Sequence, residues 1–119
     1  GRKHIFTNGT VSHAENILSA YGVGQHFDQI FDIVAANYIP KPEQYAFDRF
    51  LNRTGIDPDG AVMIEDMAAN LRPAAALGMH TVWLASDIEW ANRGSDEPFV
   101  HYKADNLKGF LRSLRAADY

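Results

Sequence analysis

The chain contains no cysteine, so disulfide bonds, thiolate metal sites and cysteine nucleophiles are excluded. It also has no apolar run approaching the roughly 18 residues of a membrane span, and no basic cluster longer than two residues. Its formal net charge is −4, from 11 Lys and Arg against 15 Asp and Glu. Nucleic acid and anionic membranes bind through a concentrated positive face, so we expect neither as the main partner. We expect a cytoplasmic protein with a small-molecule partner.

What is present is the composition of one globular domain, with 46% hydrophobic and 22% charged residues in a chain of 119. Short apolar stretches alternate with stretches of helical periodicity. The expected strands are residues 4–7, 31–35, 61–64, 81–84 and, at an edge, 99–102. The expected helices are residues 13–21, 42–54, 67–77 and 106–115. This alternation predicts an α/β fold with a parallel sheet and right-handed crossovers.

Local signals indicate where several helices begin and end. Ser12 followed by Glu15 forms a capping-box pattern at the start of the first helix. Pro42 suits the first position of the second helix, and Gly55 suits its end. Pro73 falls inside the third helix, which predicts either a start near that residue or an irregular first turn.

Polar side chains occur where three of the predicted strands end or are followed by a loop. Thr7 ends the first strand, Lys41 follows the second and Asp66 ends the third. In open parallel α/β sheets, ligands bind outside the carboxyl ends of the strands. We therefore expect these three side chains at one edge of the sheet.

Each group has a physical task at a phosphoryl site. The Thr7 hydroxyl and the backbone N–H of Asn8 can donate to a phosphate oxygen, and Lys41 offers a compact positive charge. Asp66 can hold Mg²⁺, which prefers oxygen ligands and keeps several waters. Asn70, one helical turn later, can bond to Lys41 or to a metal-bound water.

Each of these residues also has an ordinary structural interpretation. Thr7 suits a helix N-cap or a turn, and Asp66 suits an N-cap. Lys41 taken alone suits a solvated loop, and Asn8 a turn. Glu65 suits a carboxylate that offsets a helix dipole as well as it suits support of a metal site. Five histidines show no metal-ligand spacing and are expected to be structural or superficial: His4, His13, His26, His80 and His101.

Three stretches together resemble conserved blocks of the haloacid-dehalogenase-like hydrolases: residues 5–9 (IFTNG), 41–43 (KPE) and 63–71 (MIEDMAANL). Their order and separation are also similar, and the likeness covers roughly residues 3–115. The Glu65-Asp66 form of the third block is most similar to the pyrimidine 5′-nucleotidase branch.

This resemblance implies a three-layer, Rossmann-like parallel sheet and a Mg²⁺-dependent phosphatase that works through an aspartyl-phosphate. It implies that Thr7 binds phosphate, Lys41 is the catalytic lysine and Asp66 binds the metal. Such enzymes carry their nucleophile in an Asp-x-Asp block on an N-terminal strand that precedes a helical cap, and this sequence contains neither. Asp57 and Asp59 cannot replace it, since they lie in a turn before the third strand.

We therefore expect residues 1–119 to be the C-terminal part of such a core domain, truncated at its N-terminus. The expected activity is hydrolysis of a nucleoside 5′-monophosphate with a nucleophile from outside this chain. The alternatives are a non-catalytic fragment or assembly domain, a sugar-phosphate phosphatase and a haloacid dehalogenase. A sheet edge left open by the missing strand further predicts self-association.

Overall fold

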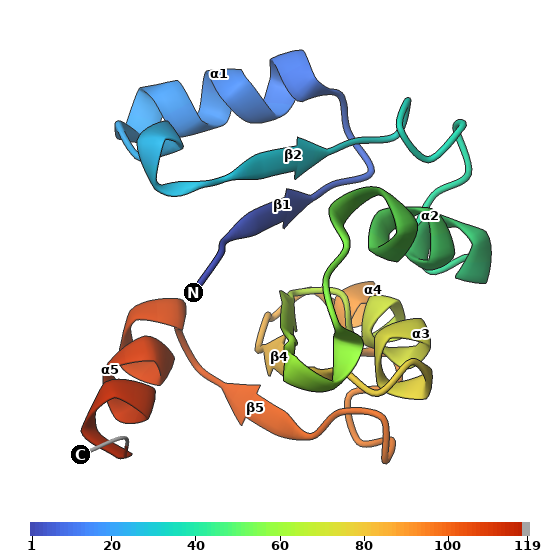
Figure 1. The fold of residues 1–119 in the computed structure, drawn as a ribbon. Helices are drawn as coiled ribbons and strands as arrows, with labels where there is room; N and C mark the ends of the chain where they lie inside the picture. The colour runs from blue at the N-terminus through green and yellow to red at the C-terminus, as the bar shows by residue number, and fades with distance from the viewer. Residues whose placement is uncertain (118–119) are drawn as a thin grey trace. The chain divides into compact units, whose positions relative to one another are not determined.

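In the computed structural model the chain forms two compact units, residues 1–55 and a second unit beginning at Ile56. The structure describes residues 1–117, with side chains described through residue 113. Within these described residues, the strands run parallel in two sheets, one of two strands in the first unit and one of three in the second (Figure 1). The predicted α/β class with parallel strands is confirmed.

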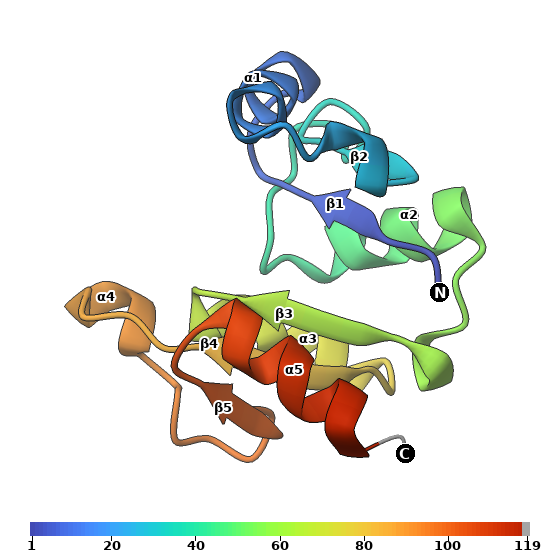
Figure 2. The same cartoon turned by 90° about the vertical axis from the view of Figure 1, so that its left-hand side faces the viewer.

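The first unit contains β1 (His4–Phe6), α1 (Val11–Tyr21), β2 (Gln29–Phe31) and α2 (Gln44–Thr54), with a 3₁₀ turn η1 at Gly24–His26. Ile5 of β1 lies opposite Ile30 of β2. The helices α1 and α2 lie on opposite faces of this small sheet, as Figures 1 and 2 both show.

Aromatic rings form the core between the sheet and α2. The Phe6 ring stacks on Phe50 with centroids 4.6 Å apart, and Phe31 meets both rings edge-on. Phe47 has no exposed surface. Since alternate residues of a strand point to opposite faces, Phe6 and Phe31 face α2 while Ile5 and Ile30 face α1.

The second unit is built around the parallel sheet β3 (Val62–Glu65), β4 (His80–Leu84) and β5 (Tyr102–Ala104), in that order. Its other elements are η2 (Pro58–Gly60), η3 (Ala68–Asn70), α3 (Leu71–Ala76), α4 (Glu89–Asn92) and α5 (Leu107–Ala117). Figure 2 shows α3 and α5 on opposite faces of the sheet.

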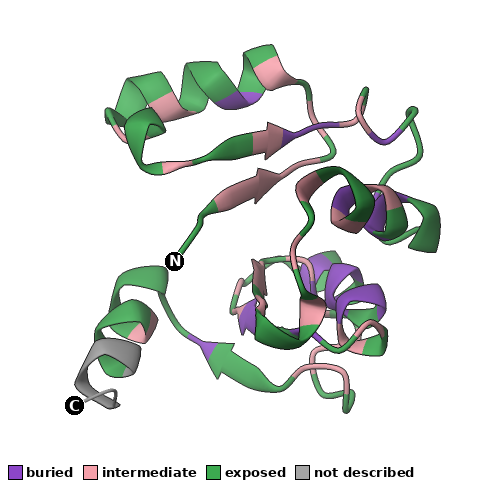
Figure 3. Cartoon of the chain, in the orientation of Figure 1, coloured by how far each residue is buried: buried purple, intermediate pink, exposed green. Residues whose placement is uncertain are grey.

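The core of the second unit lies between η3, α3 and the sheet. Ala68 and Leu71 are fully buried against Trp83, and Met63, Phe99 and Val100 pack around them. The buried residues of α2 and of α3 stand out in Figure 3. Among the described residues, none of the helices combines the length and the apolar character needed to cross a membrane.

Two of the predicted helix starts are wrong. The N-cap of α1 is Thr10, whose hydroxyl oxygen accepts from His13 N–H at 3.1 Å, and Ser12 already lies inside the helix. Helix α2 begins at Gln44, so Pro42 precedes it, in a turn where the Lys41–Pro42 peptide is cis. The third helix is irregular, as Pro73 predicts, because the 3₁₀ turn η3 precedes a short α3.

Two predicted strands are displaced. The strand expected over 31–35 ends at Phe31, because the carboxylate of Asp32 accepts from Ala35 N–H and turns the chain. The strand expected over 99–102 begins at Tyr102. Residues Phe99 and His101 instead bond to the Thr81 hydroxyl, which donates to the Phe99 carbonyl and accepts from His101 N–H.

Candidate functional site

In the first unit, Thr7 directly follows β1 and lies at the carboxyl end of the two-stranded sheet. Its N–H continues the ladder by donating to the Phe31 carbonyl at 3.0 Å. Its hydroxyl oxygen accepts from Gly9 N–H at 3.0 Å, which closes a tight turn before α1. This bond uses a lone pair of the hydroxyl oxygen, so the hydroxyl proton remains able to donate to a phosphate oxygen.

Lys41 is buried, with only 7% of its surface exposed, although it lies in a loop. Its ammonium donates to the Phe6 carbonyl at 2.7 Å and lies 4.8 Å from the centroid of the Phe6 ring. The interpretation of Lys41 as a solvated loop residue is therefore wrong. The positive charge is held at the end of β1, beside the residue that follows, Thr7.

Asn8 fixes the backbone of Lys41 across 33 residues of sequence. Its side-chain carbonyl accepts from Lys41 N–H at 2.8 Å, and its side-chain amide donates to the Lys41 carbonyl at 3.2 Å. Asn8 thus has a positioning role. The structure brings Thr7, Asn8 and Lys41 together at the carboxyl end of β1.

The sequence interpretation missed Asp32, which is 6% exposed and follows β2. One of its carboxylate oxygens accepts from Val11 N–H, the first residue of α1, at 3.1 Å, and the other accepts from Ala35 N–H at 2.9 Å. It therefore holds the start of α1 and the loop after β2 in place. An Asp directly after an apolar stretch is a turn signal that could have revealed it.

In the second unit, Glu65 ends β3 and Asp66 follows it at the carboxyl end of that strand. The Asp66 side chain is exposed, whereas its backbone carbonyl accepts from the indole N–H of Trp83 at 2.9 Å. The position of Asp66 is thereby tied to the neighbouring strand β4. Its carboxylate is presented to solvent, where it is accessible to a cation.

Asn70, at the end of η3, is 2% exposed, and its N–H donates to the Met67 carbonyl at 3.0 Å. Its side-chain oxygen is buried and has no hydrogen-bond partner within the described part of the chain. A buried acceptor without a donor is costly. Asn70 therefore marks a place in the second unit where a donor, such as an ammonium or a metal-bound water, would be favourable.

The residues of the second unit fit part of a magnesium site. Asp66 offers an exposed carboxylate, and Asn70 an unsatisfied amide oxygen nearby in sequence; both are hard oxygen donors. No group of three or more His, Asp or Glu side chains that could hold a metal occurs among the described residues. Any Mg²⁺ bound here would take further ligands from water, from a substrate or from residues outside this chain.

The six predicted site residues are thus divided between the two units. Thr7, Asn8 and Lys41 form one group in the first unit, and Glu65, Asp66 and Asn70 lie in the second unit. Each group lies at the carboxyl end of a strand, but the two groups belong to separate sheets, so their convergence on one edge of a single sheet stays a prediction.

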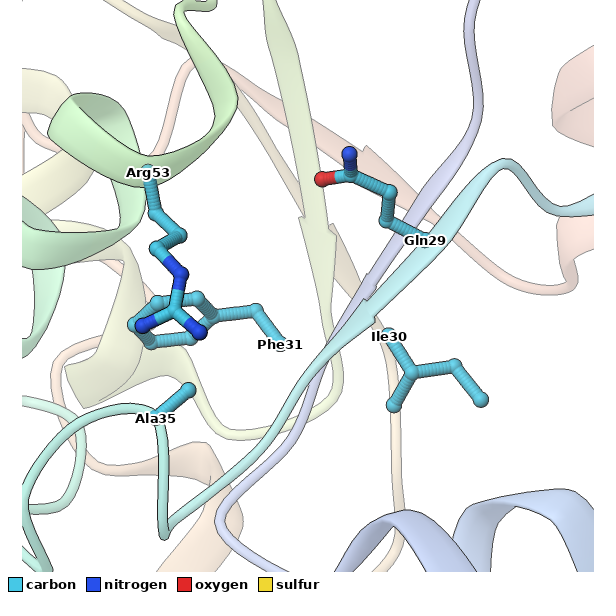
Figure 4. Close-up of a pocket in the computed structure, with 5 residues that line it drawn as sticks. All are labelled: Gln29, Ile30, Phe31, Ala35 and Arg53. Carbon is cyan, nitrogen blue, oxygen red and sulfur yellow. The ribbon is translucent and has the colours of Figure 1, made fainter.

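A shallow hollow of about 300 Å³ also lies along β2 in the first unit (Figure 4). It is lined by Gln29, Ile30, Phe31, Ala35 and Arg53. Gln29 is the first residue of β2 and Arg53 is in the last turn of α2. The hollow follows the length of the strand, so we do not assign it to the group of polar side chains at the carboxyl end of β1.

Comparison with known proteins identifies a family for this chain. A family model described as haloacid dehalogenase-like hydrolase matches residues 2–78, which is more than half of the chain and includes all six predicted site residues. Over 55 residues, 44% of this chain, the sequence is 34% identical to mouse acyl-CoA dehydrogenase family member 10, but this stretch is only 5% of that protein.

Solved structures share the fold. The putative HAD-hydrolase YfnB from Bacillus subtilis, described as bound to magnesium, has a TM-score of 0.75 and 19% identity, covering 96% of this chain and 48% of that one. A HAD phosphatase from Thermococcus onnurineus has a TM-score of 0.74 and 24% identity, covering 95% and 50%. An L-2-haloacid dehalogenase from Xanthobacter autotrophicus has a TM-score of 0.75 and 13% identity, covering 96% and 55%. The chain therefore spans about half the length of these structures.

Proposed function

This chain belongs to the haloacid dehalogenase-like hydrolases, and we propose that it supplies the phosphate-binding and metal-binding residues of a Mg²⁺-dependent phosphomonoester hydrolase. The observation that carries the proposal is the placement of Lys41. The buried ammonium donates to the Phe6 carbonyl, one residue before Thr7, so a positive charge is held at the carboxyl end of β1. A phosphate group has the charge and the acceptor oxygens that such a pair of donors suits.

In the proposed reaction, the Thr7 hydroxyl and Asn8 N–H bind oxygens of the phosphoryl group, and Lys41 offsets its charge. A carboxylate from outside this chain attacks phosphorus as the bond to the ester oxygen breaks, and a second carboxylic acid from outside this chain donates a proton to that oxygen. Water then hydrolyses the aspartyl-phosphate. Phosphoryl transfer depends mainly on placement and on stabilisation of charge, which these residues would supply. Asn8 contributes through its hold on Lys41 as well.

Asp66 would hold Mg²⁺, supported by Glu65 and by the side-chain oxygen of Asn70. When bound, the ion would neutralise part of the negative charge that accumulates on the phosphoryl oxygens. The exposed carboxylate of Asp66 and the unsatisfied oxygen of Asn70 support this assignment. The substrate we propose is a nucleoside 5′-monophosphate, by resemblance of residues 63–71 to the pyrimidine 5′-nucleotidase branch.

The test is Mg²⁺-dependent release of phosphate from nucleoside monophosphates and from p-nitrophenyl phosphate by the protein that carries this chain. Lys41→Met and Asp66→Asn should each lower kcat/KM by about a hundredfold or more, as for loss of a transition-state charge contact. Matched controls are Lys3→Met and Asp48→Asn, whose exposed side chains lie before β1 and in the middle of α2. Urea denaturation of each variant separates loss of activity from loss of fold.

Three outcomes would contradict the proposal. Full activity in both site variants would remove Lys41 and Asp66 from the reaction. If the protein instead releases halide from a 2-haloacid, and EDTA does not inhibit this reaction, the protein is a dehalogenase. A folded protein that turns over neither class of substrate would indicate a non-catalytic domain.

A further inference from the structure

The loop between β2 and Lys41 has an unusual backbone. Asn37 and Tyr38 are adjacent and both have left-handed conformations, with φ of 54° and 63°. Asn adopts this region readily, but it is sterically unfavourable for a bulky residue such as Tyr. In a protein, strained residues of this kind persist only where the surrounding structure holds them, and they cluster at functional sites.

The start of this loop is held by bonds to its backbone. The Asp32 carboxylate accepts from Ala35 N–H at 2.9 Å, and Arg49 Nε donates to the Ala35 carbonyl at 2.8 Å. Tyr38 N–H donates to the Ile33 carbonyl at 2.7 Å, which closes the turn. The left-handed residues therefore lie in a fixed turn.

The side chain of Asn37 adds a link to helix α2. Its amide donates to the Tyr45 hydroxyl at 2.6 Å, in the first turn of that helix. One short loop thus carries the aromatic side chain of Tyr38 and is hydrogen-bonded to that of Tyr45.

The strained conformation does not bury the Tyr38 ring. Tyr38 is 70% exposed, and Val34, Ile39 and Tyr45 are exposed as well. Packing in the core therefore does not account for the strain. The effect of the turn is to present an aromatic ring, with apolar neighbours, at the surface of the first unit.

The loop lies at the end of the sheet where the phosphate-binding group lies. It leaves the carboxyl end of β2, next to the carboxyl end of β1 in the same small sheet (Figure 1). Tyr38 precedes Lys41 by three residues, a stretch of at most about 10 Å when extended. A substrate whose phosphate is bound by Thr7 and Lys41 would therefore have its leaving group within reach of this loop.

We propose that Tyr38 is a specificity-determining residue, whose ring contacts the base of a nucleoside 5′-monophosphate bound by Thr7 and Lys41; this rests on the proposed function. Every nucleobase has a flat apolar face, and stacking on an aromatic side chain improves binding by about tenfold to a hundredfold. The bonds of the turn fix the backbone that carries the ring, so little backbone freedom is lost when a base binds. Sugar phosphates without a base would gain nothing from Tyr38.

The experiment compares a pyrimidine nucleoside 5′-monophosphate with ribose 5-phosphate, which lacks the base. Tyr38→Ala should lower kcat/KM for the nucleotide by about tenfold, mainly through KM, and leave ribose 5-phosphate unchanged. Tyr38→Phe, which keeps the ring, should retain the preference. Tyr21→Ala is the matched control, because Tyr21 is 77% exposed at the end of α1 and lies outside the loop.

A parallel measurement separates failure of this inference from failure of the proposed function. Equilibrium binding of the same two ligands is measured by calorimetry, also with Tyr38→Gly, which removes the ring and suits a positive φ. If nothing is hydrolysed but the nucleotide binds better than ribose 5-phosphate and Tyr38→Gly abolishes the difference, the proposed function fails and the base contact stands. If Tyr38→Ala and Tyr38→Gly affect both ligands equally, or neither, the inference is overturned.

Discussion

Asn8 and Lys41 form a two-point contact between side chain and backbone, with the side-chain amide of Asn8 both accepting from and donating to the peptide groups of Lys41. The contact joins the turn after β1 to the loop before α2. It fixes the backbone of Lys41 independently of the ammonium, whose own anchor is the Phe6 carbonyl. The lysine is therefore held at both ends.

Replacement of Asn8 by Ala should destabilise the first unit by about 1–3 kcal/mol, because two partly buried peptide groups of Lys41 lose their partners. Urea denaturation checks the free energy of unfolding. Asn16→Ala, on the exposed surface of α1, is the control and should leave stability unchanged or slightly raise it. Equal stability of Asn8→Ala and the parent chain would show that water replaces the contact.

Replacement of Asp32 by Ala should lower the free energy of unfolding of the first unit by about 2–3 kcal/mol, because it removes a buried carboxylate that accepts from two backbone N–H groups. Amide hydrogen exchange should speed up at both donors, Val11 and Ala35. Asp48→Ala, on the exposed side of α2, is the matched control. Unchanged exchange at Val11 would contradict a role for Asp32 at the start of α1.

The pKa of Asp96 is lowered, first by its hydrogen bond to Lys103 and then by the positive charge of that residue. A carboxyl group whose pKa is lower in the folded state contributes stability above its unfolded pKa and loses that contribution as the pH falls through the folded value. NMR titration of the Asp96 carboxyl should show its pKa rising in Lys103→Met, and also in high salt, because the pair is exposed. An Asp96 pKa unaffected by Lys103→Met would refute the pairing in solution.

Replacement of Gly78 by Ala should destabilise the second unit more than Gly55→Ala destabilises the first. Gly78 has φ of 99°, and a Cβ there would lie 2.6 Å from Asp59 Oδ1, so the Asp59 side chain must move. Gly55 has φ of 69° and open space around the added carbon, so its substitution costs only about 1–2 kcal/mol of backbone strain. Denaturation monitored by NMR in each unit checks the order, and a larger loss at Gly55 would contradict it.

Local sequence signals predicted the helix ends where one residue decides the backbone. Gly55 ends α2 with a positive φ, as predicted, and Gly22 has the same role at the end of α1. The start of α1 was harder, because Thr10 and Ser12 are both good caps and the sequence alone does not decide between them. The choice depends on where the chain leaves β1.

Features that depend on contacts between residues far apart in the sequence could not be predicted from local sequence patterns. Tyr102 begins β5 because Phe99 and His101 are already engaged by Thr81, about 20 residues earlier. The burial of Lys41 depends likewise on Phe6 and Asn8, more than 30 residues away. Resemblance to a family identified Lys41, whereas the residue type alone favoured a solvated loop.

The bond between the Trp83 indole and the Asp66 carbonyl gives the second unit a built-in optical probe. Trp83 is buried and its emission is sensitive to the dipole of the group that its N–H contacts, whereas Trp90 is 56% exposed. In a Trp90→Phe background, Trp83 would be the sole indole of the chain. Its fluorescence would then change when a cation shifts the Asp66 peptide. Binding of a cation at Asp66 can therefore be followed in real time, without a substrate or a label.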